Sequence, residues 1–244
     1  KTLHHAHGQR FSVFERRGGY PPELDNPDHL YRLGQTLGRI HRIGRAKPFL
    51  HRRDISSKRM ATESRVFLEE QAVPRELMNA YSTLAKDCEQ AAASLLSTMT
   101  KRDMQRVHGD CHTGNILWRD DTPHFVDLDD CVSGPAIQDI WMFLSGDRFQ
   151  QERQLSEFVS GYEEFHEFDS RQLAWIEALR TLRIMHRAFW LASRWDDTAF
   201  PRAFPWFGQA RFWSDHILEV REQLGVMQEP TLKGRWFLLQ GGSN

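Results

Sequence analysis

The stretch that decides the fold lies near the middle of the chain. It consists of His108-Gly109-Asp110-Cys111-His112-Thr113-Gly114-Asn115-Ile116-Leu117-Trp118, followed by Phe125-Val126-Asp127-Leu128-Asp129-Asp130. Apolar segments 115–118 and 124–128 predict two short strands joined by the polar turn 119–123. A loop rich in functional side chains therefore leads into a β-hairpin that ends in carboxylates.

This arrangement predicts phosphoryl transfer that depends on ATP and Mg²⁺. Such a reaction needs a hydroxyl held in line with the terminal phosphate and a cation that neutralises the phosphate charge. Magnesium takes oxygen ligands, usually one or two carboxylates together with water and phosphate oxygens. We expect Asp110 to orient the hydroxyl and accept its proton, and Asn115 and Asp127 to hold the metal.

Helical periodicity dominates on both sides of the hairpin. Asp25-Asn26-Pro27 predicts a helix start, and Pro74 opens a second long helix. Apolar residues recur at helical spacing after Pro135 and through segments 155–165, 173–190 and 212–224. The expected fold class is therefore α+β, mainly helical with a small central β-hairpin.

Composition narrows the classes of partner. The 244 residues carry 32 Lys and Arg against 33 Asp and Glu, a formal net charge of -1, so charge gives no case for nucleic acid or an anionic membrane. No apolar run is long enough for a spanning helix. Cys88, Cys111 and Cys131 form no CxxC pair, which indicates reduced thiols in a cytoplasmic protein.

The motif His-Gly-Asp-x-His-x-x-Asn followed by a hydrophobic-Asp strand resembles the catalytic and metal-binding loops of aminoglycoside phosphotransferases and choline kinases, which share the protein-kinase fold. The spacing from Asp110 to Asn115 is that of the kinase catalytic loop, and Asp127 falls at the metal-binding Asp. Segment 134–141 resembles the next family segment. The resemblance implies that His108 and Asp139 support the catalytic loop, Asp139 through hydrogen bonds to its backbone.

Four segments together resemble the bacterial stress response kinase A family: 108–118, 125–130, 134–141 and 200–206. The resemblance extends from about Phe11 to the late 220s. It implies transfer to protein Ser and Thr hydroxyls in a bacterial stress response.

The resemblance also implies a domain division. No nucleotide-covering loop or phosphate-binding Lys of an amino-terminal β lobe is found ahead of Phe11, so that lobe is expected to be absent. Residues 1–19 are expected to be the hinge strand and connection. Residues 20–244 are expected to form the helical carboxy-terminal lobe, with catalytic loop 108–118 and metal-binding segment 125–130. By the same resemblance, the backbones of Glu15 and Arg17 meet adenine and Leu117 lies beneath it.

Three alternatives stay open. The same scaffold serves kinases for small hydroxylated molecules of the aminoglycoside, choline or homoserine type, because catalytic loops do not determine the acceptor. A metal-dependent phosphoesterase would use imidazole and carboxylate ligands, namely His108, Asp110, His112, Asp127 and Asp129. An inactive, partner-binding lobe is the third.

Several polar residues carry two interpretations each. His112 either binds substrate or is structural, and Asp129 and Asp130 either contact metal or cap a turn. Four basic residues of the long helix after residue 173 either face the acceptor or lie elsewhere: Arg183, His186, Arg187 and Arg194.

Overall fold

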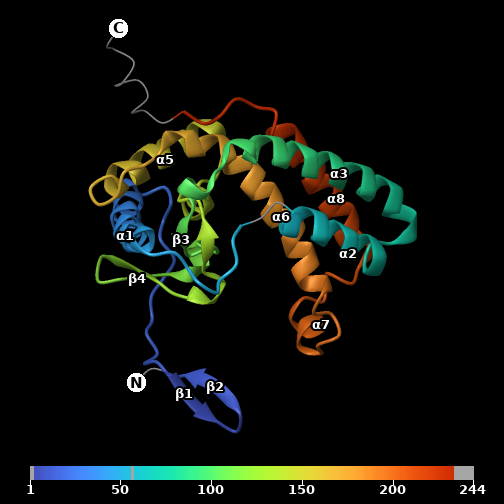
Figure 1. Cartoon of the computed structure of the whole chain (residues 1–244), viewed down its shortest axis with the longest axis horizontal. Helices are drawn as coiled ribbons and strands as arrows, with labels where there is room; N and C mark the ends of the chain where they lie inside the picture. Colours follow the sequence, from blue (N-terminus) through green and yellow to red (C-terminus); the bar gives the residue numbers. More distant parts are fainter. Residues whose placement is uncertain (1–2, 56–57, 234–244) are drawn as a thin grey trace.

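Most of the chain is helical in the computed structural model, which describes residues 3–55 and 58–233. Figure 1 labels the helices α1 (Pro27–Ala46), α2 (Ser64–Gln71), α3 (Met78–Leu95), α4 (Ile137–Ile140), α5 (Arg148–Tyr162), α6 (Ile176–Ala192), α7 (Ala199–Ala203) and α8 (Ala210–Val226). The periodicity located α1, α3, α6 and α8 to within a few residues, and it found α5 although that helix begins seven residues before the expected segment 155–165. It did not predict α2, which a π-helical turn, Lys58–Glu63, precedes.

Helix α1 begins where its sequence signals place it. The Asn26 side chain accepts a hydrogen bond from the Asp28 amide at 3.0 Å, and Pro27 occupies the first turn. The helix then packs closely on α5 through glycines. A Cβ atom on Gly161 would lie 2.0 Å from the Tyr31 carbonyl oxygen, so only hydrogen fits there.

The predicted central hairpin is present as β4 (Ile116–Arg119) and β5 (Thr122–Phe125). Its turn is tighter than the sequence predicted, because only Asp120 and Asp121 lie between the strands. Both have positive φ, 50° and 54°, as in the two-residue turns that match the twist of a hairpin.

A second strand pair, which the sequence analysis did not predict, holds the functional loop. Strand β3 (Gln105–Val107) pairs antiparallel with β6 (Val132–Gly134). Strand β3 ends just before His108, and β6 begins two residues after Asp130. The pairing therefore fixes the start of the catalytic loop beside the end of the metal-binding segment.

A third strand pair corrects the reading of the first residues. The sequence analysis expected a hinge strand and connection over residues 1–19, whereas the structure has a hairpin of β1 (Leu3–Ala6) and β2 (Gln9–Ser12) there. Every residue of both strands is exposed, and Figure 1 shows the hairpin projecting from the helical body. The connection after it joins the body where the backbones of Tyr20 and Trp118 exchange hydrogen bonds of 3.2 and 2.8 Å.

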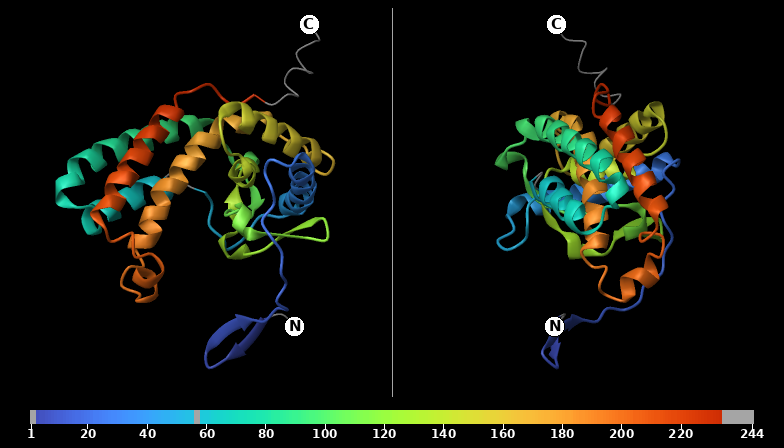
Figure 2. Two further views of the ribbon diagram at one scale, coloured as in Figure 1. Left: turned by 180° about the vertical axis from the view of Figure 1, so that it is seen from behind. Right: turned by 90° about the vertical axis from the view of Figure 1, so that its right-hand side faces the viewer.

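The helices form two groups on either side of α6. Helices α1 and α5 lie with the strand pairs β3–β6 and β4–β5, while α2, α3 and α8 pack on α6 itself (Figure 2). The most deeply buried large side chains include Trp118, Trp175, Tyr81 and Tyr162, so the core runs through both groups. Within the described ranges, no helix has the length and apolar character needed to cross a membrane.

Candidate active site

Asp110 and Asn115 come together at the ends of one short loop. The Asn115 side-chain nitrogen donates to the Asp110 carbonyl oxygen at 2.9 Å and lies 3.4 Å from its carboxylate Oδ2. The Asn115 amide also donates to the His112 carbonyl at 2.9 Å, which closes the loop. Because the amide nitrogen faces Asp110, the Asn115 side-chain oxygen is the atom that can face a cation.

Asp127 follows strand β5 in a left-handed conformation, with φ 60°. Its neighbour Val126 donates its amide to the Asn115 carbonyl at 3.0 Å, so Asp127 lies next to Asn115 in space, with its side chain exposed. An amide oxygen and a carboxylate are the kind of protein ligands that Mg²⁺ takes together with phosphate and water oxygens. No cluster of three or more His, Cys, Asp or Glu metal ligands occurs among the residues that the structure describes.

The backbone before Asp110 is held by Asp139. One carboxylate oxygen accepts the His108 amide at 2.7 Å, and the other accepts the Gly109 amide at 2.8 Å. His41 bridges Asp139 and Tyr162, with 2.9 Å to each, and the side chains of His41 and Asp139 are wholly buried. The loop is therefore anchored to α1 and α5 through one carboxylate.

Sequence reasoning missed His41. The signal was present, because position 41 continues the apolar helical series Leu30, Leu33 and Leu37 of α1. A histidine on the buried face of a helix requires a polar partner there. Only the fold identifies that partner as Asp139, which lies 98 positions along the chain.

Gly109 and His108 pack the catalytic loop against the metal-binding segment. Gly109 has φ 86°, and a Cβ atom there would lie 2.5 Å from the Asp130 carbonyl oxygen. The His108 Nε2 donates to the Val126 carbonyl at 2.8 Å, and its other ring nitrogen is buried without a hydrogen bond in the described part of the chain. This geometry makes His108 a link between loop and strand, which argues against the phosphoesterase that would need it as a metal ligand.

The remaining polar residues of the motif have local contacts. His112 accepts the Gly114 amide at 3.0 Å through Nδ1, and its Nε2 lies 3.5 Å from Asp110 Oδ2. Asp129 and Asp130 are exposed in a single 3-10 turn after Asp127. Cys111 is fully buried, and this burial raises the pKa of its thiol well above the ordinary value, so it is not an activated nucleophile.

Helix α6 brings Arg183 to the Asp110 carboxylate. Its guanidinium forms an ion pair with Asp110 Oδ1. The contact lacks hydrogen-bond geometry, and Oδ1 is buried without a hydrogen-bond partner among the described residues. Of the four basic residues that the sequence left open, Arg183 is thus placed at Asp110.

The structure places Leu117 beside the connection that carries Glu15 and Arg17. Leu117 lies in β4 against Gly19, where a Cβ atom would come within 2.8 Å of the leucine Cβ. Glu15 and Arg17, just before that glycine, are exposed and form an ion pair with each other. The connection after β2 therefore runs past the same strand that carries Leu117.

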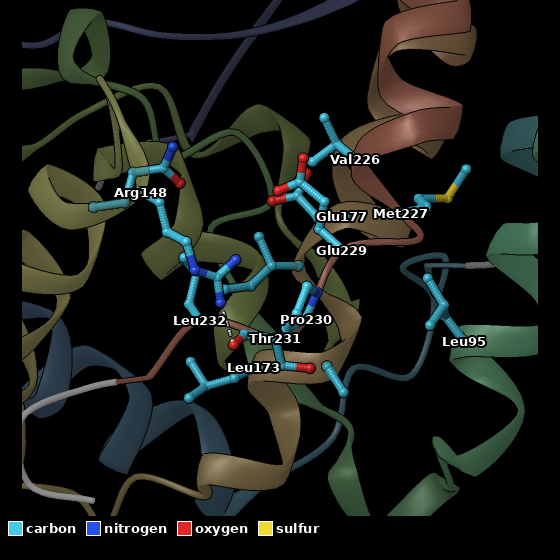
Figure 3. Close-up of a pocket in the computed structure, with 13 residues that line it drawn as sticks. Leu95, Arg148, Leu173, Glu177, Val226, Met227, Glu229, Pro230, Thr231 and Leu232 are labelled. Carbon is cyan, nitrogen blue, oxygen red and sulfur yellow. Dashed lines mark hydrogen bonds between the residues drawn. The ribbon is translucent and has the colours of Figure 1, made fainter. Parts of the chain in front are cut away.

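A cavity of about 190 Å³ lies elsewhere, between α5, the start of α6 and segment 226–232. Figure 3 shows Arg148 extending to Thr231, where its guanidinium donates a hydrogen bond of 2.5 Å to the Thr231 carbonyl oxygen. Glu177 and Met227 also line the cavity, and none of the predicted site residues does. It is therefore separate from the catalytic loop.

Comparison with known sequences identifies the family. Residues 1–176 match the model of the Phosphotransferase enzyme family. The chain is 42% identical over 233 residues to "Stress response kinase A" of Escherichia coli O157:H7, covering 96% of this chain and 70% of the relative. It is 40% identical over 238 residues to "Serine/threonine protein kinase RdoA" of Salmonella typhimurium (strain LT2), with the same two coverages.

Solved structures show the same fold at low sequence identity. Amicoumacin kinase hAmiN, in complex with AMP-PNP, Ca²⁺ and Ami, has a TM-score of 0.68 at 20% identity, over 98% of this chain and 72% of that one. A microcompartment-associated aminopropanol kinase has a TM-score of 0.61 at 14% identity, over 95% and 69%. The family model, the relatives at about 40% identity and the kinase-like fold all indicate the same family. The chain belongs to the Phosphotransferase enzyme family, as a kinase related to stress response kinase A.

Proposed function

We propose that this kinase transfers the terminal phosphoryl group of ATP, with Mg²⁺, to Ser and Thr hydroxyls of proteins in a bacterial stress response. The observation that carries the proposal is the contact of Asn115 with Asp110 beside Asp127, on a loop whose backbone Asp139 anchors. The names of the relatives support protein as the acceptor and the stress response as the physiological role. The cysteine pattern favours a cytoplasmic location.

Each residue has a distinct part in this proposal. Asp110 orients the acceptor hydroxyl and takes its proton, and Asn115 and Asp127 hold the cation. Bound magnesium-ATP supplies the phosphoryl group and the positive charge that offsets it. His108 and Asp139 keep the loop in position, while the backbones of Glu15 and Arg17 with Leu117 receive adenine.

The test compares Asp110→Asn, Asp127→Asn and the control Asp121→Asn in the full-length protein. Asp121 lies in the β4–β5 turn at positive φ, a conformation that Asn also adopts readily. Protein phosphorylation with labelled ATP should fall by about 10²–10⁴ for Asp110→Asn, and the control should retain activity. Asp127→Asn should also weaken Mg²⁺-dependent ATP binding in calorimetry, whereas Asp110→Asn should not.

The alternative acceptor is a small hydroxylated molecule on the same scaffold. The same assay is therefore run with an aminoglycoside, choline and homoserine in place of protein. Efficient phosphorylation of one of these, with none of any protein Ser or Thr in a bacterial lysate, would refute the protein-kinase proposal. Full activity of Asp110→Asn would remove Asp110 from its role.

A further inference from the structure

A line of basic residues starts beside Asp110 and runs along α6 to just beyond its end. Arg183 and Arg187 are one turn apart on the helix, and Arg194 lies in the turn that follows its last residue, Ala192. Arg183 pairs with Asp110, as described above. Arg187 lies over Trp206 at 5.8 Å and Arg194 over Trp190 at 4.9 Å. The line therefore leads from Asp110 toward the aromatic segment around α7.

Two further arginines reach the same place from another part of the chain. Helix α6 packs against the π-helical turn Lys58–Glu63, which carries Arg59, and Arg53 precedes that turn. Arg59, Arg194, Arg53 and Arg183 all act electrostatically on His186, whose ring meets the Ser64 hydroxyl at 3.1 Å. We call these four residues, Arg53, Arg59, Arg183 and Arg194, the arginine cluster.

The cluster concentrates positive charge in a chain that is nearly neutral overall. Burial and the four arginines lower the pKa of His186 to about 4, burial having the larger effect. Burial and Arg53 also lower the pKa of Arg59, although Asp54 and Glu63 oppose them. Four like charges that all act on one ring cost free energy, and an anionic ligand would relieve that cost.

We propose that the arginine cluster binds carboxylate side chains of the acceptor, so that the phosphorylated Ser or Thr lies in an acidic protein segment. This inference rests on the proposed function and adds the charge of the substrate. Arg194 follows Arg183 by eleven positions, the last two in the turn beyond α6, and at the rise of a helix this is about 16 Å. An extended peptide spans that length in about five residues, whereas a small metabolite does not.

The ion pair of Arg183 with Asp110 explains how an acidic acceptor could be preferred. Arg183 covers Oδ1 of the carboxylate that must meet the hydroxyl. A carboxylate on the acceptor competes for the same guanidinium and thereby exposes Oδ1. A cationic acceptor would instead be repelled by the cluster.

The experiment uses one Ser peptide in three versions, with Glu, Gln or Lys at the five positions on either side of Ser. Fluorescence anisotropy measures binding to the full-length protein, and labelled ATP measures kcat/KM. We expect the Glu peptide to exceed the Gln peptide by about tenfold in both, since two or three partly exposed ion pairs supply that factor. The difference should shrink as salt is raised.

Charge reversal localises the effect. Arg53→Glu with Arg194→Glu changes two exposed side chains and should move the preference from the Glu to the Lys peptide. Arg221→Glu, an exposed position of α8, is the matched control and should keep the Glu preference. Free serine and homoserine are tested beside the peptides, and either one phosphorylated as efficiently as the Glu peptide would overturn the assignment of a protein segment.

The two proposals fail in different ways. Equal phosphorylation of all three peptides would overturn the acidic-substrate inference and leave the protein-kinase proposal intact. Tighter binding of the Glu peptide without transfer to any peptide or protein would overturn the protein-kinase proposal and retain the charge selection. A Glu preference that survives the double reversal would show that the arginine cluster does not produce it.

Discussion

Replacing Asp139 by Asn tests whether one buried carboxylate holds the catalytic loop. The two oxygens of Asp139 accept hydrogen bonds from the His108 amide, the Gly109 amide and His41, at 2.7, 2.8 and 2.9 Å. Asparagine keeps one oxygen and presents an NH₂ group where the other oxygen was. That NH₂ faces a backbone or imidazole donor, and at least one buried donor loses its partner.

The magnitude follows from the number of donors. A buried polar group left without its hydrogen bond costs about 1–3 kcal/mol, and more where the lost partner is charged. We expect Asp139→Asn to lower the free energy of unfolding by about 3 kcal/mol, a large share of the roughly 5–15 kcal/mol typical of a domain. Turnover should fall further than the loss of folded protein explains, because His108 and Gly109 directly precede Asp110.

Urea denaturation followed by tryptophan fluorescence gives the free energy of unfolding, and kinase assays well below the transition midpoint give turnover. Asp147→Asn is the matched control, since Asp147 also accepts a backbone amide, that of Gln150 at 2.9 Å, at the exposed start of α5. Asn caps a helix as well as Asp does, so the control should change stability by under about 0.5 kcal/mol. An Asp139→Asn protein as stable and active as the control would refute the reasoning.

Two further perturbations probe the site's surroundings and the helix packing. Because the unfolded chain protonates histidine near pH 6.5 and folded His186 only near pH 4, folding stability should drop by up to about 3 kcal/mol as pH falls through that window. His186→Gln should weaken this dependence in urea titrations from pH 7 to 4, and an unchanged profile would contradict the assignment. Gly161→Ala should destabilise by about 3 kcal/mol or more, since its Cβ would strike the Tyr31 carbonyl. Gly225→Ala, in open space on α8, should be neutral or slightly stabilising by thermal melting, and equal effects of the two would refute the packing argument.

Sequence signals predicted those elements that depend on interactions between residues close together in the chain. The start of α1 follows from Asn26 and Pro27, because a capping side chain and a fixed φ act within one turn of helix. The β4–β5 hairpin follows from two apolar runs around a polar turn. The sequence predicted a five-residue turn, 119–123, whereas the actual turn consists of Asp120 and Asp121 alone. The contact of Asn115 with Asp110 agrees with the proposed catalytic motif, whose two residues lie within six positions of the chain.

The tertiary structure alone decided what distant segments contribute. The pairing of β3 with β6, the bridge from His41 to Asp139 and the contact of Arg183 with Asp110 join residues that are remote in sequence. Three-residue strands and single basic residues carry too little periodicity to reveal such partners. The sequence by itself thus determined that this chain has the residues for phosphoryl transfer. Only folding determined which side chains hold that loop and which charge faces it, because both depend on long-range packing.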